Sequence, residues 1–382
     1  MAIEEASLKD EKNNGNKEER STRSQWGLIW DQFKKHKAAF ISLWVIGLLV
    51  ISSVFGEFFM PLDPHQQFKG KKYSPPMSIQ FFDEKGKFHL VPFVYKYERS
   101  LNPQTWQEEW IPVYEKKYPL RIFVRGFEYK LLGLIPTNIH LFGLGKNAPP
   151  LLLFGADKLG RDTFSRIIYA TRISLSIACM GVIITLIMGV SLGGISGYYG
   201  GIVDNVVQRT SELLLSIPKL PLWMALSASI PAQWSILKVY IAIVVIISLM
   251  NWTFMARSIR SKLISLRAED FAMAARAYGA SDMRIIFRHL VPNFLSYIIV
   301  GITLAIPGMI LLETSLSFLG LGLRPPAISW GVLLEQAQNF QTVIMYPWLL
   351  MPGIFVVLAI LAFNFVGDGL RDAADPFSYV GR

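Results

Sequence analysis

The chain has 382 residues, of which 52% are hydrophobic, and it carries a formal net charge of +10 at pH 7. Several runs are apolar on all faces, which excludes an ordinary soluble domain whose helices are apolar on one face. The basic residues are scattered and no recognition module accompanies them, so the sequence argues against nucleic-acid binding. The lone cysteine, Cys179, excludes an intrachain disulfide.

Six apolar runs are each roughly as long as the ~20 residues that a bilayer core demands. We therefore predict an all-α polytopic membrane protein with six transmembrane helices, made of a five-helix core and an N-terminal helix. A charged tail, residues 1–37, precedes the first run, and no small-residue cleavage site follows that run. The first run is therefore predicted to remain as a membrane anchor. The runs cover residues 38–60, 173–197, 213–230, 236–256, 294–318 and 348–366.

The short loops predict the orientation, because cytoplasmic loops carry an excess of Lys and Arg. Seven Lys or Arg residues lie between Arg257 and Arg288, whereas the connection around Pro231 holds none. We expect the N-terminal tail, the segment 257–293 and the C-terminal tail, residues 377–382, to be cytoplasmic. The long connection after the first helix translocates largely regardless of its charge and is predicted to lie outside.

This connection, residues 61–154, is predicted to form a small β-rich extracytoplasmic insert. Residues 78–98 read as two strands around a turn at Gly86, and residues 110–135 as a second such pair. One interpretation makes the insert a docking or gating surface for a secreted partner. The alternative is that its aromatic rings fill the small core of the insert. The candidate docking residues are Trp106, Trp110 and Tyr114.

The second predicted helix begins and ends with distinct patterns. At its start, Asp and Arg residues alternate between Asp157 and Arg172, which predicts a solvated, salt-bridged face. Towards its end, glycines recur at every fourth residue and so share one face, along which another transmembrane helix can approach closely. We interpret this ridge as a packing surface. Its members are Gly189, Gly193, Gly197 and Gly201.

Two charged residues lie inside predicted spans. Pro218 and Pro221 flank Lys219 in the third helix, and Glu313 lies in the fifth. Prolines free backbone carbonyls that protein or water must satisfy, and a charge at depth must face a partner or a wet cavity. Lys219 and Glu313 are therefore candidates for a translocation path. A static ion pair that fixes helix packing is the competing interpretation.

The sequence lacks the motifs of covalent chemistry. It has no G-x-x-x-x-G-K-[ST] loop to cradle a nucleotide. Its five histidines are far apart and form no i, i+4 pair of the kind that a helical metal site needs. Neither a G-x-S-x-G elbow nor a cysteine with a plausible base is present. We predict no catalytic residue, no metal site and no cofactor bound by this chain.

A charged and patterned segment separates the fourth and fifth predicted helices. Apolar residues from Phe271 to Tyr278 fall at i, i+3, i+4 and i+7, as on one stripe of a short helix. Gly279 is predicted to end this helix and Ser281 to cap the next. The same spacing repeats from Met283 to Leu290, until Pro292 begins the return to the membrane. Because a lone short helix is marginal in water, the stripe must pack on its own membrane domain or on a separate cytoplasmic protein.

Within this segment, AARAYGASDMRIIFRHLVPN resembles the EAA loop of ABC-importer permeases, where small residues, a glycine and a closing hydrophobic–proline pair stand at set spacing. Four more motifs in order are similar to the dipeptide and oligopeptide permease family: DKLGRDTFSRIIYATRISL, GGISGYYGG, ETSLSFLGLGLRPPAISWG and NFVGDGLRDAADP. The resemblance covers a permease core, residues 155–376, and not the insert. Departures from the family pattern are Met273 for Glu, Ala170 for Gly, His289 for Ile and Val291 for Leu.

The resemblance implies a permease subunit of an ATP-driven, binding-protein-dependent peptide importer in the plasma (inner) membrane of a prokaryote. It implies a second homologous permease subunit, two ABC ATPase subunits that bind ATP and Mg, and an extracytoplasmic substrate-binding protein. The segment 257–293 would then carry a coupling helix seated in an ATPase cleft, and helices two to six would alternate access around a central cavity. The implied coupling residues are Glu269, Asp270, Phe271, Ala274, Ala275, Arg276, Tyr278, Gly279, Ala280, Asp282 and Arg284.

Two alternatives to a peptide importer stay open. The same family also carries oligosaccharides and nickel complexes. A different class of function would be an ATP-independent channel or a membrane scaffold, neither of which needs a coupling loop.

Overall fold

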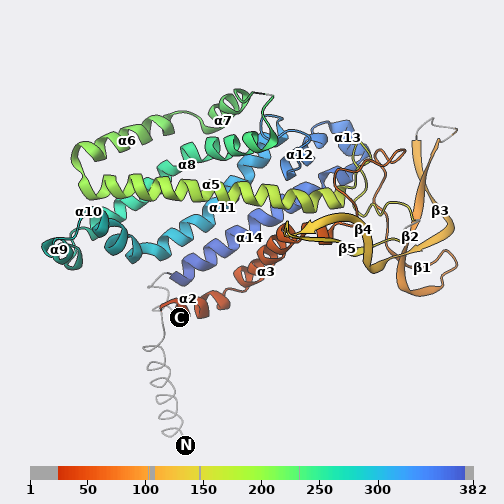
Figure 1. Ribbon diagram of the computed structural model, residues 1–382, viewed down its shortest axis with the longest axis horizontal. Coiled ribbons are helices and arrows are strands. Elements are labelled where there is room, and N and C mark those ends of the chain that lie inside the picture. Colours follow the sequence, from red (N-terminus) through yellow and green to blue (C-terminus); the bar gives the residue numbers. More distant parts are fainter. Residues whose placement is uncertain (1–24, 102, 104–107, 146–147, 232, 375–382) are drawn as a thin grey trace, which may run out of the picture.

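The computed structural model describes residues 25–101, 103, 108–145, 148–231 and 233–374. A bundle of long helices carries a group of strands at one end. At the other end lie α2, Gln25–Lys35, α9, Asp270–Ala277, and the C-terminal end of α14, Met351–Ala374 (Figure 1). Within the described residues, five helices are long and apolar enough to cross a membrane. They are Lys37–Val54, Thr163–Tyr199, Ile236–Leu266, Asp282–Phe318 and Pro347–Ala374.

The first predicted span, 38–60, is interrupted near its C-terminal end. Helix α2, Gln25–Lys35, precedes α3, Lys37–Val54, and the chain breaks at Phe55 before the short helix α4, Gly56–Phe59. The 18 residues of α3 are about 27 Å long, close to the ~30 Å of a hydrocarbon core. Helix α3 is therefore about long enough to cross a hydrocarbon core.

The third predicted span, 213–230, is not one helix. Helix α6, Gly201–Ser216, and helix α7, Lys219–Ala228, are separated by extended backbone at Ile217 and Pro218. Proline has no N–H for the helical ladder and its ring clashes with the preceding turn, so the helix stops before it. This break is why the structure has five continuous candidate spans where the apolar runs predicted six.

Glycines bring α5, Thr163–Tyr199, against α8, Ile236–Leu266. A Cβ added at Gly197 would lie 2.8 Å from the carbonyl oxygen of Arg260, so a larger residue would push the two backbones apart. Gly189 and Gly193 meet α8 in the same way, as predicted. Gly201 does not belong to this ridge: it follows the end of α5, at a φ of +55°, with open space around it.

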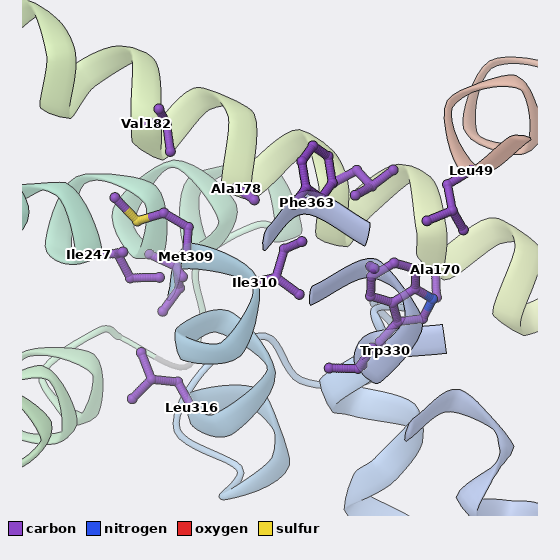
Figure 2. Close-up of a cluster of buried hydrophobic side chains, with 14 of the residues drawn as sticks. Leu49, Ala170, Ala178, Val182, Ile247, Met309, Ile310, Leu316, Trp330 and Phe363 are labelled. Carbon is purple, nitrogen blue, oxygen red and sulfur yellow. The ribbon is translucent and has the colours of Figure 1, made fainter. Parts of the chain in front are cut away.

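The core of the bundle lies where five helices converge. Leu49 of α3, Ala178 of α5 and Ile247 of α8 are buried there together with Ile310 and Phe363 (Figure 2). The last two come from α11 and α14. The bounds of the remaining helices are α11, Leu295–Phe318; α12, Trp330–Leu334; α13, Phe340–Met345; and α14, Met351–Ala374.

The described residues of the insert form five strands in two antiparallel groups. Strands β1, Gln80–Phe82, β2, Phe88–Leu101, and β3, Glu108–Pro119, form one sheet in that order. Strands β4, Arg121–Leu131, and β5, Ile135–Gly143, form a separate hairpin.

The first predicted strand pair is present and the second is wrong. Gly86 turns the chain between β1 and β2 at a φ of +75°. The predicted partner strands β3 and β4 do not pair: Trp110 of β3 lies opposite Arg99 of β2, and Val124 of β4 lies opposite His140 of β5. The turn at Leu132 and Gly133, where both φ angles are positive, falls inside what the sequence suggested was one strand.

The charged start of α5 is salt-bridged but not solvated, contrary to the prediction. Asp157 is 2% exposed and Arg166 is also 2% exposed. Arg161 Nε donates to Asp157 Oδ2 at 2.7 Å, and Arg166 Nη1 donates to the carbonyl of Pro64 at 2.9 Å. Such charges tolerate burial because they are paired and hydrogen-bonded. Asp162 accepts from the N–H of Ser165 at 2.8 Å as the N-cap of α5, and burial raises its pKa to about 6.

Candidate functional site

Helix α9, Asp270–Ala277, ends in the glycine turn that the sequence predicts. Gly279 has a φ of +78°, the left-handed conformation that glycine adopts without a Cβ penalty. Its N–H donates to the carbonyl of Arg276 at 3.0 Å, and the N–H of Ala280 donates to the carbonyl of Ala275 at 3.1 Å. These two bonds form a Schellman motif, so the role of Gly279 in ending the helix is confirmed.

The second helix of the predicted pair is continuous with the following span. Helix α10, Asp282–Arg284, runs through a π-helical turn, Ile285–Leu290, and a 3₁₀ turn, Val291–Phe294, into α11. The predicted boundary at Pro292 is wrong, because this proline lies in the first turn of the 3₁₀ segment, where its missing N–H interrupts little. Ser281 occupies the N-cap position without a side-chain cap hydrogen bond. A displacement of α10 is therefore a displacement of α11.

Polar contacts tie both flanks of α9 to the end of α5. The hydroxyl of Tyr198 donates to Asp282 Oδ1 at 2.8 Å. On the other flank, Arg267 Nη1 donates to the carbonyl of Gly197 at 3.1 Å. Arg260 Nη2 lies 2.5 Å from Asp204 Oδ2, which links α8 to α6, and this guanidinium lowers the pKa of Asp204.

Of these connecting residues, sequence reasoning singled out only Asp282 and missed the others. Asp204 and Arg260 are 56 positions apart, so no local spacing rule pairs them. The signal available was the motif GGISGYYGG, which contains Tyr198, although its letters do not show which side chain it meets.

The bundle covers only one side of α9. Ala272 is 4% exposed and packs with Leu263 and Ile285 in a second apolar cluster. The predicted stripe faces away from this cluster: Tyr278 is 92% exposed and Phe271 is 40% exposed. Ala274 is also exposed, and Ala275 is half-buried.

Large apolar side chains are exposed on α9 and on the residues that follow it, and we call them together the α9–α10 patch. Charged residues that are all exposed border it: Glu269, Asp270, Arg276 and Arg284. The stripe had two alternative partners, the membrane domain of this chain and a separate protein. Packing on the membrane domain accounts for only one of the four stripe residues, Ala275. The patch consists of Phe271, Met273, Tyr278, Met283 and Phe287.

Glu313 is fully buried and held by hydroxyl groups. Ser317 Oγ donates to its Oε1 at 2.9 Å, and Ser174 Oγ of α5 donates to its Oε2 at 3.1 Å. Ser329, the N-cap of α12, is a further hydrogen-bond partner. Ser174 in turn accepts from the N–H of Trp330 at 3.1 Å, so the carboxylate organises the junction of α5, α11 and α12.

Lys219, unlike Glu313, is not buried. It is the first residue of α7, directly after the break at Pro218, and its side chain is exposed on the single chain. The structure does not bring Lys219 and Glu313 together as an ion pair.

The docking candidates of the insert have different surroundings. Trp110 is half-buried, with Lys71 Nζ 5.3 Å from its ring centroid. Tyr114 is 46% exposed and makes an edge contact with the buried ring of Tyr95, with centroids 4.9 Å apart. Trp106 lies outside the described residues.

Two family patterns match the chain. The family described as "Binding-protein-dependent transport system inner membrane component" matches residues 189–377. The family described as "N-terminal TM domain of oligopeptide transport permease C" matches residues 24–76. The first match contains α9, Gly279 and the α9–α10 patch.

Individual relatives are similar over most of their own length. A dipeptide transport system permease protein, DppC, of Alkalihalophilus pseudofirmus is 42% identical over 58% of this chain and 71% of its own. DppC of Lactococcus lactis subsp. cremoris is 32% identical over 91% of this chain and 89% of its own. An oligopeptide transport system permease protein, OppC, of Bacillus subtilis is 36% identical over 58% and 71%. With this similarity and its five candidate spans, the chain belongs to the family of binding-protein-dependent transport system inner membrane components, which are transport permeases.

Proposed function

We propose that this chain is the permease subunit of an ATP-driven importer of peptides and forms the translocation path with a second permease subunit. The names of the relatives, which are dipeptide and oligopeptide permeases, support peptides as the cargo. The observation that carries the proposal is the α9–α10 patch. A surface of five exposed large apolar side chains at the end of a membrane bundle marks a protein interaction site.

The patch is the seat of a cytoplasmic ATPase subunit, and the ATPase pair binds ATP and Mg. Closure of the pair is a rigid-body event that moves whatever is seated in its clefts. Movement of α9 passes to α11 through the continuous helix from Asp282 to Phe318, and to α5 through Tyr198. Both helices line the core of the bundle, so the helices that surround the path move together.

The arrangement of the two ends supports this topology. The strands lie at the end of the bundle opposite α9, α2 and the C-terminal end of α14 (Figure 1). With α9 on the cytoplasmic side, both termini are cytoplasmic and the insert is extracytoplasmic. There the insert receives the substrate-binding protein, and Trp110 and Tyr114 remain its candidate contacts. Lys219, exposed at the break between α6 and α7, faces the path.

The test replaces Tyr278 by aspartate in the full chain, expressed with its partner subunits. Tyr278 is 92% exposed, so folding of the chain is not at risk, whereas an unpaired carboxylate in an apolar cleft opposes docking. We expect loss of ATPase co-purification and of peptide uptake into proteoliposomes. The matched control is Leu90→Asp, because Leu90 is 86% exposed on β2.

Unchanged ATPase binding in Tyr278→Asp would contradict the coupling role of the patch. Peptide uptake that continues without ATP would favour a channel. Competition of uptake by oligosaccharides or nickel complexes, and not by peptides, would reassign the cargo.

A further inference from the structure

His140 lies on β5, where the β4–β5 hairpin packs on α4 beside the end of α3 (Figure 1). It is 1% exposed. Both of its ring nitrogens face backbone carbonyl oxygens: Nδ1 lies 2.8 Å from the oxygen of Glu57 in α4, and Nε2 lies 3.1 Å from the oxygen of Phe127 in β4. A carbonyl oxygen only accepts hydrogen bonds, so the ring makes both bonds only when both nitrogens carry a proton.

The backbone of β4 is shaped around this ring. The pairing of β4 with β5 shifts register between Arg125 and Tyr129, as at a β-bulge, and Phe127 lies inside the shifted segment. Gly126 lies there too: a Cβ added to it would be 2.6 Å from His140 Cδ2, so a larger residue would displace the imidazole. The irregular stretch of β4 therefore gives the ring both its space and its second carbonyl.

The contact at Nδ1 joins the hairpin to the helices of the bundle. The carboxylate of Glu57 accepts from Arg172 of α5 through both oxygens, at 2.6 Å each. Burial raises the pKa of this carboxyl and the Arg172 guanidinium lowers it, with a net fall, so the pair stays charged at neutral pH. Arg172 Nε also donates to the carbonyl of Ser53, near the end of α3, at 2.7 Å. One chain of polar contacts thus runs from β5 through α4 to α5 and α3.

The other titratable and charged groups near the ring do not pair with it. His140 borders a cavity of about 400 Å³ that Asp63 and Arg125 also line, and water in this cavity can carry protons to the ring. The hydroxyl of Tyr129 donates to the carbonyl of Ile139 at 2.6 Å, and burial raises its pKa, so it stays protonated at neutral pH. Within the described residues His140 makes no ion pair. The two carbonyls are therefore the groups that distinguish the charged ring from the neutral one.

The hairpin depends on its contact with α4 because it is a sheet of its own. Within the described residues, β4 and β5 pair with each other and with no further strand. An isolated two-stranded hairpin is marginally stable in water at best. The ring of Phe58 in α4 adds a contact to the ring of Phe123, with centroids 6.3 Å apart. A weaker contact at His140 should therefore loosen the whole hairpin.

We propose that His140 is a pH-dependent latch between the β4–β5 hairpin and α4. With a proton on both nitrogens, the ring donates to Glu57 and Phe127 at once and fixes the hairpin to α4. With one proton, the ring keeps one of these bonds and turns the lone pair of its other nitrogen towards a carbonyl oxygen. A buried acceptor then lacks its donor, which is unfavourable. Acid therefore closes the latch and base loosens it, within the range of about pH 5–8 in which histidine side chains change their charge.

The test measures amide hydrogen exchange by mass spectrometry on the full chain, purified with its partner subunits and held in lipid nanodiscs. Exchange of the β4–β5 hairpin is followed at about pH 5.5 and about pH 8, on either side of the histidine range. Each rate is divided by that of the same unstructured peptide at the same pH, which removes the intrinsic effect of pH. Two variants are compared with the unmodified chain. His140→Gln replaces the ring by a neutral amide, and His89→Gln changes another histidine of the insert that lies outside the hairpin.

We expect the corrected exchange of the hairpin to be about 2–10-fold faster at the higher pH, as the loss of one hydrogen bond implies. In His140→Gln the corrected exchange should be fast at both pH values, whereas His89→Gln should behave as the unmodified chain does. Equal corrected exchange at both pH values in the unmodified chain would overturn the proposal. A pH dependence that persists in His140→Gln would also overturn it, because another group, such as the buried Asp162, would then govern the hairpin. These outcomes do not depend on transport or on the identity of the cargo.

Discussion

Replacement of Gly279 by alanine tests whether the shape of the α9 turn controls coupling to the ATPase. A Cβ at this position would meet nothing within 4 Å, so the substitution adds no steric clash. Its cost is the left-handed backbone alone, about 1–2 kcal/mol for a residue with a Cβ. The φ of +78° can relax if the last turn of α9 unwinds, and that turn carries the exposed ring of Tyr278.

This cost translates into a measurable change in docking. A strain of 1–2 kcal/mol shifts the ratio of formed to unwound turn by about 5–30-fold. Helix α9 has eight residues, and Ala272 is its one buried residue, so little else opposes unwinding. We expect ligand-stimulated ATP hydrolysis by the reconstituted complex to fall by up to this factor, about 5–30-fold. Gly279→Val, with a β-branched side chain, should reduce it further and should also release the ATPases during purification.

Gly86→Ala is the matched control. Gly86 has a φ of +75° and open space around its Cα, so the same substitution stores the same backbone strain, but in the insert. Membrane insertion and binding of the second permease subunit should be normal in both variants. Wild-type ATP hydrolysis in Gly279→Ala would refute the reasoning. Equal loss in Gly86→Ala would do so too, because strain anywhere in the chain would then suffice.

Four further predictions address separate parts of the molecule. Arg276→Glu, on the exposed border of the α9–α10 patch, should weaken ATPase binding in a salt-dependent way, as measured by affinity at two ionic strengths; salt-independent binding would contradict it. Glu313→Ala leaves buried serine hydroxyls without their acceptor and should destabilise the purified chain by about 1–3 kcal/mol, seen as a lower Tm. In a separate experiment, a cysteine placed at 219, but not one placed at 313, should react with a water-soluble thiol reagent in at least one transport state. Hydrogen bonds from His89 and then Lys117 lower the pKa of Asp83, so its contribution to stability is present above its ordinary pKa of 3.8 and is lost as the pH falls below that value; protease resistance of the insert should decline over that range, and Asp83→Asn should remove the dependence.

Apolar runs predicted the five candidate spans, and they did not predict where the helices end. Helix α8 extends to Leu266, and the fifth apolar run, 294–318, is preceded by helix from Asp282 onward, so both helices continue beyond the predicted span boundaries. Hydrophobicity indicates which solvent surrounds a helix. Where a helix leaves the bilayer, its composition becomes polar, but its backbone hydrogen bonds continue, so hydrophobicity does not indicate its end. The glycine turns at 86 and 279 were predictable because a positive φ is a property of one residue.

Features that join distant segments were beyond the reach of the sequence. The burial of Arg166 depends on Pro64, which is 102 positions away, and the pairing of β3 with β2 depends on a register that no single turn sets. The groups around Glu313 come from α5, α11 and α12 together. A glutamate in an apolar run therefore indicated that its burial is unfavourable, but it did not indicate which hydrogen-bond donors compensate for that burial. Local chemistry predicted the turn at Gly279, whereas tertiary contacts decide which face of α9 is exposed.

The proposed coupling needs two features of the α9 region together: its exposed face, and the contacts that join it to α5 and α11. Neither feature could transmit force alone. An apolar patch on a freely hinged loop would bind an ATPase without moving the bundle. Here the patch is bordered by Asp282, whose carboxylate is held by Tyr198 of α5 and whose helix continues into α11. Separating the two properties is feasible: Tyr198→Phe removes the hydroxyl and leaves the patch intact. We expect this variant to retain the ATPases while ATP hydrolysis becomes less dependent on ligand, whereas loss of ATPase binding would place Tyr198 in the docking surface instead of the joint.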